Sequence, residues 1–262
     1  MAHSTSQGAA LLKGWQKLNR FDSGLGARLP AAYKKFWFEW KVQEPAAVHF
    51  VPKEGMFERD DKTGLVTPIQ NVKIPLMRVP EEHDGIWGGE AIIKGFQKRN
   101  PYKRRVPHFW VPTLKRSVVR SEVLNEFFSV TVTDRTLRLI MDHHGFDHYL
   151  LKTPACDLRS QLALKIKQQI LNDLNKGCPG WTENQQRQKE VKAEYGKYLE
   201  QYTPEEIEWY GLNWDEAIKK MRQIVDDESV PVPHKTIFRQ KLIEQLKEAG
   251  IEEAQDVVTS AK

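Results

Sequence analysis

The spacing of prolines is the feature that most constrains how this chain can fold. Five of them fall between residues 41 and 90, at Pro45, Pro52, Pro68, Pro75 and Pro80. Each proline fixes its own φ and removes a backbone donor, so no long helix can run through this stretch. Pro101, Pro107 and Pro112 hold residues 91–117 largely extended, because the residue before a proline avoids the helical region. We therefore expect extended chain with short strands over residues 41–117.

Three glycines in DGIWGGE, residues 84–90, predict tight turns, because glycine adopts positive φ without strain. A phosphate-binding loop is the alternative interpretation. It would require GxxxxGK followed by Ser or Thr, set between a strand and a helix, and neither is present here. The sequence therefore favours a turn.

Residues 116–154 predict a small core made of one hairpin and one short helix. In RSVVRSEVLNEFFSVTVT, alternation places Phe128, Val130 and Val132 on one face and hydroxyl side chains on the other. Thr133 or Asp134 is placed to cap the next helix, and Gly145 to end it. We expect its apolar stripe to be formed by Leu137, Ile140 and Met141.

The pattern becomes helical after residue 155. Apolar residues recur every four positions at Leu158, Leu162, Ile166, Ile170 and Leu174, and Gly177 follows as a stop. Further helices are predicted to start at Thr182, at Thr203-Pro204 and at Asn213, and a last one to run from about Thr236 to Ala249, before Gly250. The predicted fold class is α+β: a small β-hairpin core with a short helix, extended basic segments and an all-α C-terminal extension.

Charge is distributed unevenly along the chain. Residues 1–120 hold 21 Lys and Arg against 11 Asp and Glu, whereas the remainder holds 19 against 24. This asymmetry indicates a front half that faces a polyanion and a back half that faces water or protein. Eight of the basic residues lie in residues 91–117, which contain no acid and carry the rings of Phe96, Tyr102, His108, Phe109 and Trp110.

Such a stretch is typical of RNA contact. Lys and Arg bind phosphates and release condensed counterions. Aromatic rings stack on unpaired bases, and folded RNA is held in this way. The alternative is an ordinary solvated charge run on a strand.

The N-terminus is basic and poor in acids. Before Glu39 its only acid is Asp22. This composition is typical of a mitochondrial presequence, or transit peptide, but equally of a mature arm that docks on the same polyanion. A third interpretation is an arm on anionic membrane, in which Lys13, Lys17 and Arg20 would lie beside Leu11, Leu12 and Trp15.

Other classes of function have weaker support. The two cysteines, Cys156 and Cys178, lack the CxxC spacing of a zinc site, so we expect neither a metal nor another cofactor. The sequence contains no run of about eighteen apolar residues, so we expect no membrane-spanning helix. The cluster of Asp142, His143, His144, Asp147 and His148 is the basis of an alternative function, a metal-dependent phosphodiesterase.

Two segments carry a family resemblance: GIWGGEAIIKGFQKRNPYKRRVPHFWVP and FFSVTVTDRTLRLIMDHHGFDHYLLKTP. Together they resemble the bacterial-type large-subunit ribosomal protein twenty-eight family, and its mitochondrial members more closely still. That family has a glycine turn, a basic run, an aromatic strand, a hairpin and a helix with a glycine stop, and all occur in this order between Gly85 and Pro154. Some bacterial members carry zinc-binding cysteines, which this core lacks.

The resemblance implies a structural, non-catalytic protein of the large subunit of the mitochondrial ribosome, located in the matrix. Its implied partners are large-subunit ribosomal RNA and, through the C-terminal helices, neighbouring ribosomal proteins, with no small-molecule substrate. The basic run and the helix start correspond to RNA-contacting positions of the family. With the neighbouring basic and aromatic side chains, the predicted RNA-binding set is Lys94, Lys98, Arg99, Tyr102, Lys103, Arg104, Arg105, His108, Trp110, Lys115, Arg116, Arg135 and Arg138.

Four segments follow from the pattern and the resemblance together. We expect a basic extension or presequence over residues 1–45 and an extended Pro-rich segment over 46–83. The family core would occupy residues 84–155, and a helical extension residues 156–262. At the end of the core helix, His143-His144 stands where the family usually has basic residues.

Overall fold

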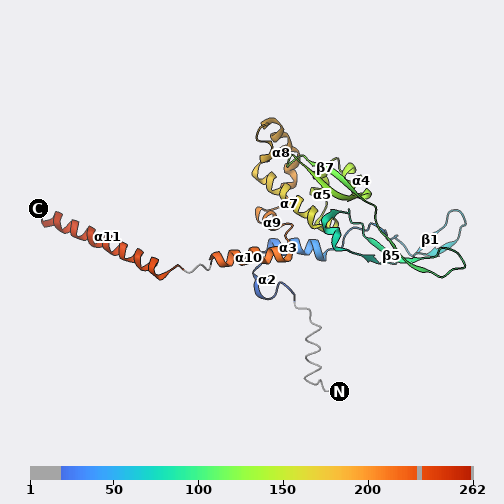
Figure 1. Ribbon diagram of the computed structural model, residues 1–262, viewed down its shortest axis with the longest axis horizontal. Coiled ribbons are helices and arrows are strands. Elements are labelled where there is room, and N and C mark those ends of the chain that lie inside the picture. Colours follow the sequence, from blue (N-terminus) through green and yellow to red (C-terminus); the bar gives the residue numbers. More distant parts are fainter. Residues whose placement is uncertain (1–18, 229–231, 261–262) are drawn as a thin grey trace, which may run out of the picture. The chain divides into compact units, whose positions relative to one another are not determined.

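The computed structural model describes residues 19–228 and 232–260, and Figure 1 shows its elements. The chain forms two compact units, Met1–Ala217 and Ile218–Lys262. The mixed α+β class expected from the sequence is confirmed, since small sheets of two or three strands occur together with many helices. The division into four segments stays a prediction, and its first eighteen residues lie outside the described part.

Short helices at the start of the described chain bury an aromatic cluster. They are α2 (Gly24–Arg28), α3 (Ala31–Trp37) and the π-helical turn η1 (Phe38–Val42). Tyr33, Phe36 and Trp40 are buried in unit 1, where Phe36 lies 4.7 Å from the ring of Tyr210. The indole of Trp40 donates to the carbonyl of Arg159 at 2.9 Å. The aromatic part of this basic segment is therefore core.

The strands form three small sheets. In the first, β1 (Phe57–Arg59) pairs antiparallel with β2 (Val66–Pro68). In the second, β5 (Ile92–Gln97) lies between β3 (Leu76–Met77) and β6 (Val106–Trp110), antiparallel to both. In the third, β8 (Glu126–Thr133) pairs antiparallel with β7 (Leu114–Ser121) and parallel with β4 (Gly85–Ile86), which follows η2 (Pro80–Asp84).

The predicted hairpin and helix of the core are confirmed. Val130 and Val132 are buried, and Thr133 caps α4 (Asp134–Asp142) by accepting from the amide of Thr136. The predicted stripe of α4 is partly wrong, because Met141 is 73% exposed. Thr136 occupies the buried face instead, and its hydroxyl donates to the carbonyl of Ile86 at 2.8 Å.

The end of α4 also differs from expectation. The left-handed residue there is His144, with φ of 61°, rather than Gly145. His144 and Gly145 donate to the carbonyls of Met141 and Ile140, both at 3.0 Å, which is the Schellman pattern. Histidine enters the left-handed region more readily than most residues, so a side chain can stand where glycine is usual. Gly145 then precedes α5 (Phe146–Lys152).

The turn between β7 and β8 is held by one buried carboxylate from α5. Asp147 Oδ2 accepts from Ser121 Oγ at 3.0 Å, from Glu122 N at 2.7 Å and from Val123 N at 2.9 Å. Burial raises the pKa of Asp147 above its ordinary value, although these three hydrogen bonds act in the opposite direction. Asp147 therefore joins the helix to the hairpin.

The rest of the chain is helical as predicted, with three corrections. The elements are α6 (Ala155–Leu158), α7 (Gln161–Lys176), η3 (Pro179–Trp181), α8 (Gln185–Leu199), α9 (Pro204–Trp209), α10 (Trp214–Glu228) and α11 (His234–Ser260). Leu158 belongs to a separate short helix, α8 is capped by Asn184 and not Thr182, and α11 continues through Gly250. The stop at Gly177 and the helix start at Thr203-Pro204 are confirmed, and Thr203 and Glu206 form a capping box there.

Lys167 of α7 is a buried amine, and we expect its protonation to affect stability. Its Nζ donates to the carbonyl of Thr153 at 2.8 Å and lies 5.5 Å from the ring centre of Tyr210. Burial lowers the pKa of Lys167 to about 8. Below this pH the folded and unfolded states both hold the proton. Between this pKa and the ordinary lysine pKa of 10.5 the unfolded state binds more protons, so stability should rise with pH in that window.

We expect Lys167→Met to raise the free energy of unfolding at pH 7 by about 1–3 kcal/mol, because a methionine fills similar space without a buried charge. The rise of stability between pH 8 and 10.5 should be smaller in this variant by the contribution of the lysine. Urea titrations of both proteins at several pH values measure the difference. Equal pH slopes in the two proteins would contradict the assignment of a buried charge.

Candidate nucleic-acid interface

Residues 92–110 form one antiparallel hairpin, which we call the basic hairpin. The predicted extended chain is present, but it folds back on itself, so that Ile93 lies opposite Trp110 and Gln97 opposite Val106. Asn100 and Pro101 make the turn. The amide of Lys103 donates to the carbonyl of Asn100 at 3.1 Å, and that of Tyr102 donates to the Asn100 side chain.

The base of the basic hairpin is anchored in unit 1. Ala91 and Ile92 are buried, and β3 adds a third strand at Ile92 and Ile93. The amide of Ala91 donates to His49 Nε2 at 2.9 Å, which requires that nitrogen to be unprotonated. Burial lowers the pKa of His49, in keeping with this role. The hairpin therefore starts from a fixed position.

The tip of the basic hairpin concentrates positive charge. Its members are Lys98, Arg99, Lys103, Arg104 and Arg105, and all five are exposed. In the described part of the chain none of these five side chains forms an ion pair. Like charges at such short spacing repel one another, so an anionic partner would stabilise the tip.

The two faces of the hairpin carry different rings. Cross-strand partners share a face, so Lys94 and Phe96 lie with Phe109, and His108 lies with Trp110 on the other side. The indole of Trp110 covers Gly95, where an added Cβ would lie 2.8 Å from it. The rings of His108 and Trp110 meet edge to face, with 4.8 Å between their centres. Tyr102, at the tip, is 97% exposed. The ribbon therefore presents rings on both faces and at its end.

The remaining predicted positions lie on β7 and α4, and three of them already have partners. Lys115 pairs with Asp134 at 2.8 Å, and Arg116 Nε donates to Ser129 Oγ at 3.0 Å. Arg135 is half-buried, and its Nε donates to the carbonyl of Gly88 at 3.2 Å. Arg138 is exposed. The predicted set is thus divided between the hairpin and a second group.

One pair of this second region is missing from the predicted set. Arg120 on β7 lies over the ring of Phe127 on β8, with 5.7 Å between the guanidinium carbon and the ring centre. Phe127 is 71% exposed. Strand alternation places Arg116 and Arg120 on the same face, so the sequence did contain the signal for a basic, aromatic sheet surface.

The alternative cluster does not assemble into a metal site. Asp147 is turned toward the β7–β8 turn, as described above. His148 lies 3.1 Å from the hydroxyl of Tyr198 and 3.0 Å from Glu194 Oε1. Among the residues that the structure describes, no three His, Cys, Asp or Glu side chains are placed to hold a metal ion. The phosphodiesterase interpretation is therefore not favoured.

None of the helices in residues 19–228 and 232–260 combines the length and apolar character needed to cross a membrane.

Several known proteins are similar to this chain along most of its length. The Drosophila melanogaster protein named large ribosomal subunit protein bL28m is 59% identical over 254 residues, which cover 97% of this chain and 84% of that protein. The Bos taurus protein of the same name is 36% identical over 242 residues, covering 91% and 92%.

A shorter similarity extends to a bacterial protein. Large ribosomal subunit protein bL28 of Ehrlichia canis is 36% identical over 74 residues, which cover 28% of this chain and 73% of that protein. The matched length is close to that of the predicted family core, residues 84–155. No protein-family model matches the chain.

Proposed function

The chain belongs to the bL28m family of mitochondrial large ribosomal subunit proteins, and we propose that it holds large-subunit ribosomal RNA with the basic hairpin and performs no catalysis. It acts in the mitochondrial matrix as a structural constituent of the large ribosomal subunit. Its relatives are named for that subunit, so the anionic partner proposed for the hairpin is the RNA of that subunit.

The observation that carries the proposal is the exposed tip, whose five cations form no ion pair within the part of the chain that the structure describes. RNA phosphates supply that counter-charge, and counterion release makes the contact favourable at cellular salt. The exposed rings of Phe96, Tyr102 and Phe109 add stacking surfaces for unpaired bases. An isolated two-stranded hairpin is only marginally stable in water, so the distal part of the basic hairpin should become more ordered when it binds RNA.

The second group extends the same contact. Arg116, Arg120 and Phe127 share one exposed face of the β7–β8 hairpin, with the hydroxyl of Ser129 among them. Arg138 is exposed on α4, next along the chain. We assign this sheet face a supporting role, because Arg116 must keep or exchange its hydrogen bond to Ser129 on binding.

Helix α11, in the second unit, supports a different kind of contact. Phe238, Leu242 and Leu246 are spaced four residues apart and so lie along one side of the helix, and they are 64%, 56% and 64% exposed. A stripe of this kind is typical of a helix that packs on another protein. Neighbouring ribosomal proteins are the partners that we propose for it.

Ultraviolet cross-linking of intact mitochondrial large subunits tests the RNA-binding role of the hairpin. Nucleotide adducts located by mass spectrometry should fall on residues 92–110, with Tyr102 and Phe96 as the expected acceptors because their rings are exposed. The shorter β1–β2 hairpin, with exposed Phe57, is an internal control. Adducts on the control hairpin and none on residues 92–110 would rule out the proposed interface.

A further inference from the structure

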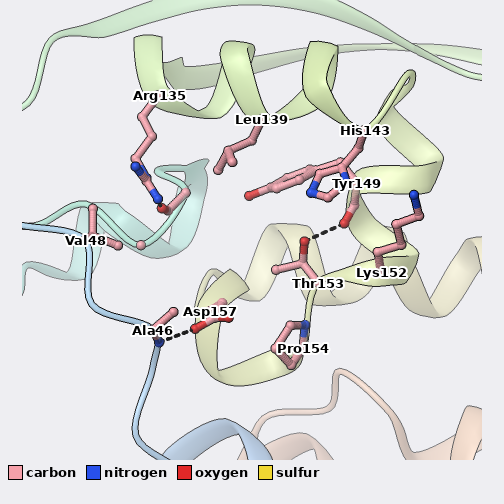
Figure 2. Close-up of a pocket in the computed structure, with 12 residues that line it drawn as sticks. Ala46, Val48, Arg135, Leu139, His143, Tyr149, Lys152, Thr153, Pro154 and Asp157 are labelled. Carbon is pink, nitrogen blue, oxygen red and sulfur yellow. Dashed lines mark hydrogen bonds between the residues drawn. The ribbon is translucent and has the colours of Figure 1, made fainter. Parts of the chain in front are cut away.

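A cavity of about 250 Å³ lies beneath α4, and its lining includes no residue of the basic hairpin. Arg135 and Leu139 of α4 and His143, which directly follows it, are spaced four residues apart, and Figure 2 shows all three projecting toward the space. Tyr149 and Lys152 of α5 line it from the other side. Lys152 is exposed, so the cavity opens to solvent at its rim.

The glycine turn after β4 closes one wall of the cavity and holds Arg135 in place. Gly88 and Gly89 have φ of 58° and 82°, and a Cβ on Gly88 would lie 2.9 Å from Thr136 Oγ1 and 3.3 Å from Leu139 Cδ1. Only glycine allows the turn to approach α4 this closely. The carbonyl of Gly88 accepts from Arg135 Nε, which fixes the guanidinium at the wall. The other two guanidinium nitrogens of Arg135 have no hydrogen-bond partner in the described part of the chain.

The chemistry of the lining combines an apolar slot with cations. Leu139 offers apolar surface beside the largely buried ring of Tyr149. The ring centres of His143 and Tyr149 are 6.0 Å apart, and the two rings are tilted by 33°. Arg135 and Lys152 supply positive charge. The one acid in the lining, Asp157, is already used: its Oδ1 accepts from the amide of Ala46 at 2.7 Å.

The size limits the ligand. Pockets for drug-sized ligands enclose about 300–1,000 Å³, so this cavity suits a single planar heterocycle better than a whole cofactor. A base against Leu139 and His143 would place its phosphate within reach of the rim, where Lys152 can pair with it. Arg135, held at the glycine wall, can donate to the edge of the base.

We propose that this cavity receives one nucleotide turned out from ribosomal RNA, with its base in the apolar slot facing Arg135 and its phosphate on Lys152. The proposal rests on the RNA-binding function above and adds a second, base-inserting site to it. Proteins that hold folded RNA commonly capture such unstacked bases between rings and cations.

Binding of mononucleotides to the purified full chain tests the cavity separately from the hairpin. The probes are the four nucleoside 5′-monophosphates, with adenosine and inorganic phosphate as partial ligands, followed by NMR of the His143 ring. At least one monophosphate should bind about tenfold or more tightly than either partial ligand. Lys152→Gln should weaken it about tenfold, the effect of one charge-assisted hydrogen bond. Lys62→Gln, an exposed lysine on the β1–β2 turn, is the matched control and should change nothing.

A second variant covers the apolar slot. Leu139→Phe should fill the space and weaken binding of the monophosphate at least as much as Lys152→Gln does. An unchanged melting temperature of this variant would show that the fold is kept. Binding no tighter than that of inorganic phosphate, or binding insensitive to both variants, would overturn the nucleotide site. In cross-linked large subunits, adducts on His143 or Tyr149 support the site. Adducts on the hairpin alone would remove the cavity and leave the function of the hairpin intact.

Discussion

Replacing all five basic residues at the hairpin tip with glutamine should weaken binding to large-subunit ribosomal RNA by about a thousandfold or more at 0.15 M salt. The residues are Lys98, Arg99, Lys103, Arg104 and Arg105. If each neutralises one phosphate, the log–log slope of affinity against salt includes about −3.5 to −4.5 from this tip. That contribution nearly disappears at 1 M salt, so the variant and the natural chain should converge there.

Filter binding of the full chain to transcribed ribosomal RNA, from 0.1 to 1 M salt, measures this slope. A matched control removes five exposed cations elsewhere in unit 1: Arg59, Lys62, Lys176, Lys189 and Lys192. Both variants change net charge equally, so a general electrostatic attraction would weaken them alike. Equal losses, or a tip variant with an unchanged slope, would exclude the tip as the phosphate-binding element. Replacing Arg104 and Arg105 alone should flatten the slope by about 1.4 to 1.8.

Asp147→Ala should lower the free energy of unfolding by about 3–5 kcal/mol. The carboxylate is 1% exposed and is the acceptor for Ser121 Oγ and for the amides of Glu122 and Val123. Its removal leaves those donors buried without a partner, and each costs about 1–3 kcal/mol, partly offset because a desolvated charge is also removed. Chemical denaturation of the isolated protein measures the loss.

Asp147→Asn is the matched comparison, because its amide oxygen can still accept from the same turn. It should cost much less than the alanine variant. Since burial raises the pKa of Asp147, its favourable contribution is largest when it is protonated and falls as pH rises through the native pKa. The asparagine variant should lose this acid-range dependence. Similar losses in both variants would show that cavity formation, rather than the hydrogen bonds, dominates.

The sequence predicted those parts of the fold that depend on local chemistry. Alternation defined β8, and the hydroxyl of Thr133 and the box of Thr203 with Glu206 defined two helix starts. The pairing of β5 with β6 was not predicted, because prolines in this stretch indicate extended chain without showing what it pairs with. The left-handed backbone of His144 was missed since glycine at the next position is the stronger local signal.

The candidate site was predictable as a composition but not as a geometry. Charge density identified the tip cations, and these do gather at one turn. It could not show that Arg135 is fixed by Gly88 or that Lys115 pairs with Asp134, because these partners are brought together by tertiary contacts. The cavity under α4 depends on how closely the glycine turn approaches Leu139 and Thr136, which no local pattern encodes.

The buried rings of α3 impose an order on biogenesis. Tyr33 donates to the carbonyl of Leu212, 179 residues later in the chain. A chain threaded through an import channel with its amino end leading would keep Tyr33, Phe36 and Trp40 uncovered until most of it had arrived. Aromatic surface that stays uncovered favours aggregation, so we expect a chaperone to hold the chain during import. Residues near Tyr210, which arrive late, thereby cover the aromatic rings of the first described helices. A chain that stalls before Tyr210 keeps those rings exposed and should be a substrate for proteolysis.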